Sequence, residues 1–200
     1  MSSVEFFFDY GSPYSYLADS RLDALAQRTG ADVIYRPMLL GGVFKATGNQ
    51  SPFVEPVEAK RQYFSLELRR CVRLLGVAFE NNPHFPINTL SLMRAAYAAR
   101  ALEVFAAFHA AIYPAFWARG LDLGKSEIIE GVLSEAGLDG KKILDLSVSD
   151  DIKAGLRVTT EEAVERGVFG APTFFVDGEM FFGNDRMDLV ENALACEGER

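Results

Sequence analysis

The first forty residues alternate an apolar strand, a helix and a second strand, and this order restricts the folds that the chain can adopt. Residues 4–9 are mostly apolar and end at Tyr10-Gly11-Ser12-Pro13, which is typical of a buried strand followed by a turn. Apolar residues then recur at near-helical spacing until Gly30, and residues 31–38 have the pattern of a second strand. Because such crossovers are right-handed and join parallel strands, we expect a parallel pair here.

The end of the chain returns to strands. Asp177-Gly178 separates two apolar segments, residues 173–176 and 179–182. This dipeptide favours a tight hairpin, because both turn positions need positive φ. Residues 188–195 are expected to form a final helix.

The middle of the chain is predicted to be helical. Residues 56–76, residues 88–117 and shorter segments up to 167 contain helix formers with apolar positions three and four apart. No fixed repeat is present. The prediction is an α/β chain in which a large all-helical segment, residues 45–159, is inserted into a domain made of residues 1–44 and 160–200.

Composition excludes several classes of protein. With 49% hydrophobic and 24% charged residues in 200, the chain can bury a core, so disorder is excluded. The formal net charge is −8 and no Lys/Arg run exceeds two residues, which disfavours nucleic-acid binding. The most apolar stretch, residues 104–118, contains His109 and Pro114 and is too short for a membrane span.

Cysteine usage indicates a reducing environment. Cys71 and Cys196 are the two cysteines, and neither belongs to a Cys-x-x-Cys motif or a Cys/His cluster. We therefore expect a cytoplasmic protein without a metal site or a redox dithiol. His84 and His109 are too isolated to indicate a metal.

The turn at Ser12 is the first candidate for chemistry. It lies where a strand leads into a helix, and the free N–H groups of a helix start favour an anion. Thiol oxidoreductases of the thioredoxin type carry Cys-x-x-Cys at this position, whereas this chain has Ser12 and Ser15. A hydroxyl can donate a hydrogen bond to the thiolate of another molecule. The alternative is that Ser12 only caps the helix, with Pro13 at its first position.

Two later motifs have similar alternatives. Ala171-Pro172, after Gly170 and before the hairpin, is where thioredoxin folds hold a cis-proline that leaves the preceding backbone free for a peptide-like ligand; otherwise it is an ordinary turn. Asp185-Arg186, after the hairpin, can hold the charged groups of an amino-acid-like ligand. The alternative is that Asn184 or Asp185 caps the last helix.

Taken together and in order, the motifs of the chain resemble those of the 2-hydroxychromene-2-carboxylate isomerase family, which is related to kappa-class glutathione transferases and DsbA oxidoreductases. The resemblance covers nearly the whole chain. It rests on Ser12-Pro13-Tyr14, Tyr35-Arg36-Pro37, Leu39-Leu40-Gly41-Gly42-Val43-Phe44, Thr47-Gly48-Asn49, Phe85-Pro86-Ile87-Asn88-Thr89, Gly170-Ala171-Pro172-Thr173 and Phe182-Gly183-Asn184-Asp185-Arg186.

The resemblance implies a thioredoxin-like domain of the DsbA/kappa type with a helical insertion, glutathione as cofactor and a homodimer. It implies that Ser12 faces the glutathione sulfur and that the other cofactor-binding residues are Asn49, Ala171 before cis-Pro172, Asn184, Asp185 and Arg186. One departure is visible, because Ser51-Pro52 stands where many relatives have consecutive prolines.

The implied activity is a glutathione-dependent cis-trans isomerisation. It interconverts 2-hydroxychromene-2-carboxylate and trans-o-hydroxybenzylidenepyruvate, an aromatic 2-oxo acid, during aromatic hydrocarbon catabolism. The substrate carboxylate needs a cation, and Arg36 and Lys60 are the candidates, although both residue types are usually solvated surface charges. Two alternatives remain: a kappa-class-like transferase that releases a glutathione conjugate, and a non-catalytic thioredoxin-fold binding protein.

Overall fold

The computed structural model describes residues 2–197, and within them one four-stranded mixed sheet forms the centre of the fold. Its strands are β1 (Ser3–Phe8), β2 (Asp32–Pro37), β3 (Thr173–Val176) and β4 (Glu179–Phe182). They lie in the order β2-β1-β3-β4. β1 is parallel to β2 and antiparallel to β3, and β3 is antiparallel to β4.

The helices account for most of the remaining chain. They are α1 (Pro13–Asp19), α2 (Leu22–Thr29), α3 (Leu40–Thr47), α4 (Glu58–Leu75), α5 (Leu90–Ala101), α6 (Phe105–Trp117), α7 (Ser126–Glu135), α8 (Gly140–Ser147), α9 (Asp150–Glu165) and α10 (Met187–Glu197), with the short 3₁₀ turns η1 (Pro52–Val54) and η2 (Asn184–Arg186).

The expected parallel pair and hairpin are both confirmed. β1 pairs with β2 in register from Ser3–Asp32 to Phe8–Pro37. The hairpin turn has φ values of 47° at Asp177 and 82° at Gly178, so both turn positions have the positive φ that the dipeptide predicts.

The single helix expected up to Gly30 is wrong, because the chain forms α1 and α2 with a break between them. The Ser20 hydroxyl donates to the carbonyl of Leu17 at 2.8 Å, which offers the backbone an alternative to continuing the helix. Arg21 then reaches the end of the chain, donating to the carbonyl of Asn184 and pairing with Asp188. A long-range contact of this kind leaves no local sequence signal.

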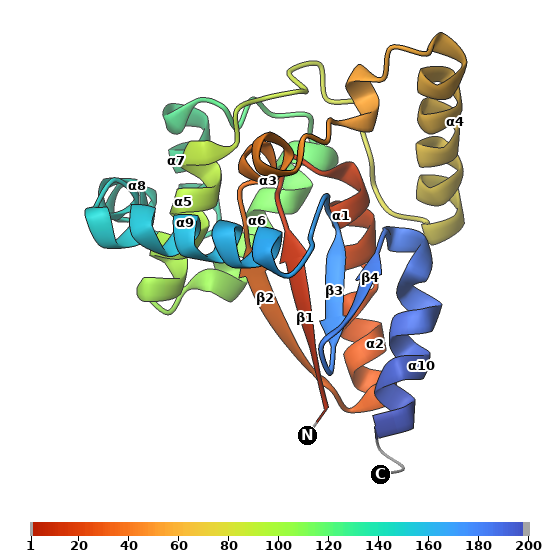
Figure 1. The fold of residues 1–200 in the computed structure, drawn as a ribbon. Coiled ribbons are helices and arrows are strands. Elements are labelled where there is room, and N and C mark those ends of the chain that lie inside the picture. The colour runs from red at the N-terminus through yellow and green to blue at the C-terminus, as the bar shows by residue number, and fades with distance from the viewer. Residues whose placement is uncertain (1, 198–200) are drawn as a thin grey trace.

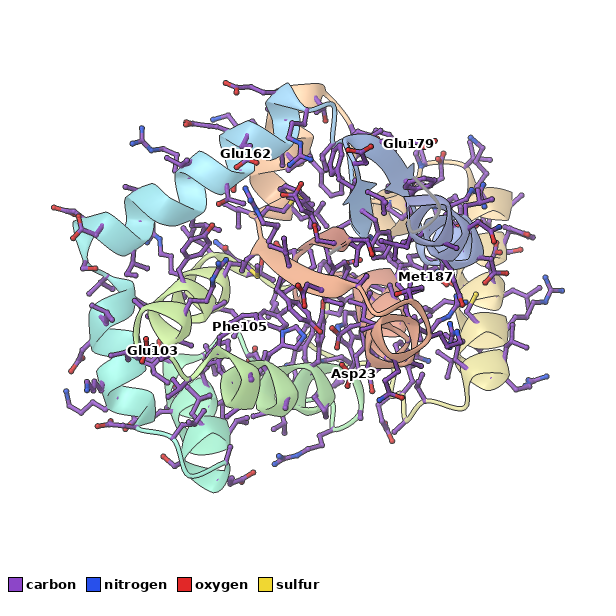
Figure 2. The ribbon with its side chains drawn as sticks, turned by 90° about the horizontal axis from the view of Figure 1, so that it is seen from below. Asp23, Glu103, Phe105, Glu162, Glu179 and Met187 are labelled. Carbon is purple, nitrogen blue, oxygen red and sulfur yellow. The ribbon has the colours of Figure 1, made fainter. Side chains whose placement is uncertain are left out.

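The two faces of the sheet pack against different helices. Phe6, Phe8 and Phe174 belong to the larger core, which also contains residues of α1, α2, α5, α6 and α10. Phe7 and Phe175 point to the opposite face, where they pack with residues of α3 and α9. In Figure 2, α9 with Glu162 lies on one side of the sheet, while α2 with Asp23 and α6 with Phe105 lie on the other.

The helical middle of the chain covers two different sides of the sheet. α4 stands beside α1 and α10, whereas α5, α7 and α8 lie at the opposite side of the molecule (Figure 1). α9 crosses the predicted domain boundary at residue 160 and packs against β2 and α3. The division into residues 1–44 with 160–200 and residues 45–159 remains a prediction. In the described part of the chain, none of the helices is long and apolar enough to cross a membrane.

Candidate active site

Ser12 is the residue that begins α1, and its hydroxyl makes two hydrogen bonds. As the N-cap it accepts from the Ser15 N–H at 3.1 Å, and Pro13 occupies the first helical position. The same hydroxyl donates to the carbonyl of Ala171 at 3.0 Å. The residue as a whole is 4% exposed. Ser12 therefore caps α1, and its hydroxyl also contacts the loop before Pro172.

The loop that faces Ser12 contains a cis Ala171–Pro172 peptide bond, as expected. The carbonyl of Pro172 accepts from the Gly183 N–H at 3.0 Å, which joins the loop to the end of β4. An added Cβ at Gly170 would lie 2.8 Å from the ring of Phe182, so a larger residue there would displace that ring. Within residues 2–197 the Ala171 N–H has no hydrogen-bond partner. A peptide-like ligand can supply one.

Asn49 lies on the other side of this loop. α3 ends at Gly48, which has φ of 71° and turns the chain away from the helix. The Asn49 amide then donates to the carbonyl of Phe169 at 2.8 Å. Asn49 thus contacts the loop that contains Ala171, although more than a hundred residues separate the two segments in the sequence.

Asn184, Asp185 and Arg186 form η2, next to α1. Gly183 has φ of 105°, and an added Cβ there would lie 2.6 Å from a carboxylate oxygen of Asp185. Asn184 is buried, whereas Arg186 pairs with Asp185 at 2.5 Å on the surface. The turn therefore presents one acid and one base beside the helix that Ser12 begins.

Tyr14 connects the Ser12 turn to α4, and sequence reasoning did not assign it a role. Its ring stacks on Phe53 with centroids 6.4 Å apart, and its hydroxyl points at the carbonyl of Phe64. Burial raises the pKa of Tyr14 to about 12, and the nearby carboxylates of Glu67 and Asp185 contribute. The phenol is therefore neutral at physiological pH.

Asp9 is a second residue that the sequence did not identify. Its buried carboxylate accepts from the N–H of Gly11, the N–H of Leu40 and the hydroxyl of Thr89, each at 2.9 Å. Burial raises the pKa of Asp9, and these three hydrogen bonds oppose that shift. The sequence feature that could have identified Asp9 is an acidic residue at the end of an apolar strand. The carboxylate fixes the turn that carries Ser12.

The two candidate cations for the substrate carboxylate lie in different surroundings. Arg36 pairs with Glu5 and Glu162 on the α9 side of the sheet, where Figure 2 shows Glu162. Its guanidinium is thus held by two carboxylates. Lys60 is exposed in the first turn of α4 and pairs with Glu55 at 3.7 Å.

Cys71 on α4 is half-buried, and burial raises the pKa of its thiol, followed by the charges of Glu67 and Asp185. A thiol in this environment is a poor nucleophile. The side chain of Cys196 lies outside the described residues. Among the side chains that the structure describes, no group of three or more His, Cys, Asp or Glu residues is arranged to hold a metal ion.

Comparisons with known proteins show which families the whole chain resembles. A family model for the DSBA-like thioredoxin domain matches residues 3–195. A 2-hydroxychromene-2-carboxylate isomerase of Sphingobium xenophagum is 33% identical over 192 residues, covering 96% of this chain and 97% of the relative. Glutathione S-transferase kappa 1 of Rattus norvegicus is 30% identical, covering 96% and 90%. A solved structure of a 2-hydroxychromene-2-carboxylate isomerase superposes with a TM-score of 0.80 at 29% identity, covering 98% and 96%.

The chain therefore belongs to the family of DSBA-like thioredoxin domains. Within it, the resemblance to the 2-hydroxychromene-2-carboxylate isomerase family and the thioredoxin-like fold with inserted helices are confirmed. These relatives support an enzyme of the isomerase or glutathione-transferase kind. A structure of a probable DsbA oxidoreductase from Streptomyces coelicolor, 21% identical with a TM-score of 0.80, shows the same fold.

Proposed function

We propose that this protein is a glutathione-dependent isomerase that interconverts 2-hydroxychromene-2-carboxylate and trans-o-hydroxybenzylidenepyruvate. The observation that carries the proposal is the Ser12 hydroxyl, which faces the carbonyl before cis-Pro172 at 3.0 Å. Serines stand at both positions where a thioredoxin-type oxidoreductase has cysteines, so this turn has no disulfide chemistry of its own. The three isomerases that match at 32–33% identity support the reaction.

The residues around Ser12 fit glutathione. The unpartnered N–H of Ala171, before Pro172, suits the backbone of a cysteinyl residue. Asn49 lies across the same loop and would contact the ligand there.

At the adjacent turn, Asp185 would take the ammonium group of the γ-glutamyl end, and Arg186 with Asn184 its carboxylate. The arrangement thus offers a hydroxyl for the sulfur, a backbone donor for the peptide and two charges for the amino-acid end.

Glutathione would supply the thiolate that adds reversibly to the ring-opened unsaturated 2-oxo acid, so that a double bond becomes a rotatable single bond. The protein must favour that thiolate. A free thiol has a pKa of about 8.5, and lowering it by two units requires about 2.7 kcal/mol. A charge-assisted hydrogen bond contributes about 1.5–3 kcal/mol.

The Ser12 hydroxyl has one proton, so it must turn from the Ala171 carbonyl to donate to a sulfur. Its oxygen can meanwhile keep accepting from the Ser15 N–H. Because α1 has only seven residues, its dipole contributes less than a long helix would, and the hydroxyl becomes the main donor.

The remaining features of the proposal follow from the family. We propose a homodimer acting on a small aromatic 2-oxo acid in aromatic hydrocarbon catabolism. The cytoplasmic location expected from cysteine usage remains a prediction, as do Arg36 and Lys60 as carboxylate ligands.

Replacing Ser12 with alanine tests the proposal. We expect Ser12→Ala to slow isomerisation about 10–100-fold, because the thiolate loses one charge-assisted donor. The pKa of bound glutathione, followed by the ultraviolet absorbance of its thiolate, should rise in parallel. Ser15→Ala is the matched control, because it removes a buried hydroxyl without a partner and keeps the backbone N–H. A Ser12→Ala variant with full activity and an unchanged thiol pKa would contradict the mechanism.

The same assays separate the alternatives. The kappa 1 relative favours a transferase as the second candidate, and that activity would consume thiol in proportion to the electrophile added. An isomerase leaves the thiol concentration unchanged. A non-catalytic binding protein would show no affinity for glutathione by calorimetry.

A further inference from the structure

A cavity of about 800 Å³ lies between α3, α5 and α9. Its walls are largely apolar and include Leu39, Leu90, Leu156 and Val164. Cavities of about 300–1,000 Å³ with apolar walls and a few polar groups are typical sites for small organic molecules. The cofactor-binding residues proposed above do not line it, so a separate ligand can occupy it.

Two residues that line this cavity, Leu39 and Leu90, are sequence neighbours of residues that contact the turn before Ser12. Leu90 follows Thr89, whose hydroxyl donates to the Asp9 carboxylate at 2.9 Å. The methyl group of Thr89 also packs against Gly11, because a Cβ added at Gly11 would lie 2.8 Å from that methyl group. Leu39 precedes Leu40, whose N–H donates to the same carboxylate at 2.9 Å. The α3 and α5 walls of the cavity are thus one residue away from groups that contact Asp9 or Gly11.

Arg94 contributes a cation to the cavity from α5. Its Nε atom is buried and has no hydrogen-bond partner among the described residues, and no carboxylate of those residues forms an ion pair with its guanidinium. Leaving a buried donor of a charged group unsatisfied is costly. The Nε–H and one Nη–H of arginine form a planar fork that matches both oxygens of a carboxylate.

The other charged groups at the cavity come from α9. Lys153 pairs with Asp150 at 3.3 Å, so its charge is already matched. Arg157, Glu161 and Glu165 are exposed to solvent, where charges interact weakly. Arg94 is therefore the cation with a desolvated, unused donor.

We infer that Arg94 binds the carboxylate of the acceptor substrate in this cavity, while the apolar walls hold its aromatic ring. The inference rests on the proposed function and names the residue that recognises the substrate class, an aromatic acid. It gives the carboxylate a partner other than Arg36, which already pairs with Glu5 and Glu162.

A pair of matched ligands tests the assignment by calorimetry. Chromone-2-carboxylate keeps a bicyclic ring and a carboxylate, and chromone lacks the carboxylate. We expect the wild-type protein to bind the acid at least tenfold more tightly than chromone. Arg94→Gln should remove that preference, Arg94→Lys should keep part of it, and Arg73→Gln on exposed α4 should keep all of it.

A variant on the cavity wall provides a second measurement. Ala46 lines the cavity from the exposed side of α3, so Ala46→Trp can fill space there without disturbing the core. We expect it to weaken binding of both ligands. No binding of the acid to the wild-type protein, or a preference that survives Arg94→Gln, overturns the inference. Glutathione affinity is measured in a separate experiment. A protein that does not bind glutathione would refute the proposed function, whereas the comparison of the acid with chromone would still show whether Arg94 binds a carboxylate.

Discussion

Tyr14 shows how one residue near the proposed active-site turn acquires its properties from several elements. Its ring is half-buried against Phe53 of η1, and the negatively charged carboxylates of Glu67 in α4 and Asp185 in η2 lie near its hydroxyl. Burial and both carboxylates oppose formation of a phenolate, and the pKa of Tyr14 is raised from 10.0 to about 12. The phenol therefore keeps its proton at physiological pH, with its hydroxyl pointing at the carbonyl of Phe64.

The raised pKa predicts a stability effect of known sign. Between pH 10 and about 12 the unfolded chain loses the Tyr14 proton while the folded chain keeps it. The unfolded state therefore binds fewer protons, and the free energy of unfolding falls as pH rises through this window. Tyr14→Phe should show a shallower fall, measured by urea unfolding at a series of alkaline pH values. Equal slopes in both proteins would show that Tyr14 ionises normally when folded.

At the scale of elements, sequence patterns predicted the structures that depend on neighbouring residues alone. Asp177-Gly178 predicted the hairpin correctly, because the tight turn needs positive φ at two adjacent positions and these two residues adopt it readily. The break after Asp19 was missed because Arg21 is held by residues of η2 and α10, far along the chain. Arg94 was missed because it falls among apolar stripe residues of α5, and the sequence alone does not show that its Nε is buried without a partner.

His109 illustrates a contact that only the assembled helices create. It lies buried in α6, where its Nε2 is 2.8 Å from Asp19 at the end of α1 and its Nδ1 is 2.8 Å from the Tyr10 hydroxyl. His109→Leu would leave the buried Tyr10 hydroxyl without a partner and would remove one hydrogen bond of Asp19, which keeps its bond to Tyr35. We expect the free energy of unfolding to fall by about 1–3 kcal/mol in chemical denaturation.

The control for this substitution is His84→Ala, because His84 is more exposed and only approaches Asp122 at 3.7 Å. Its free energy of unfolding should stay within about 0.5 kcal/mol of the wild-type value. A His109→Leu variant as stable as His84→Ala would mean that the buried bonds to Asp19 and Tyr10 contribute no net stability.

At the scale of the molecule, α4 is the element whose outer face needs explanation. Within its 18 residues, Leu68 is the buried one, while Tyr63, Leu66 and Leu74 are exposed at 51%, 38% and 85%. Tyr63, Leu66, Arg70 and Leu74 follow helical spacing, so these side chains share one face, in which Arg70 is the charged member. Three exposed apolar side chains beside one arginine make this face the candidate contact for the homodimer that we propose.

The proposed homodimer predicts a specific response to charge on this face. Light scattering should give twice the mass of one chain for the wild-type protein, and Leu74→Glu should shift the population toward monomers by placing a charge in an apolar contact. Val148→Glu is the matched control, since Val148 is also exposed, at 60%, but lies between α8 and α9 on the opposite side of the molecule (Figure 1). If Leu74→Glu and Val148→Glu both remain dimeric, the subunits associate through another surface, whereas a monomeric wild-type protein would refute the dimer itself.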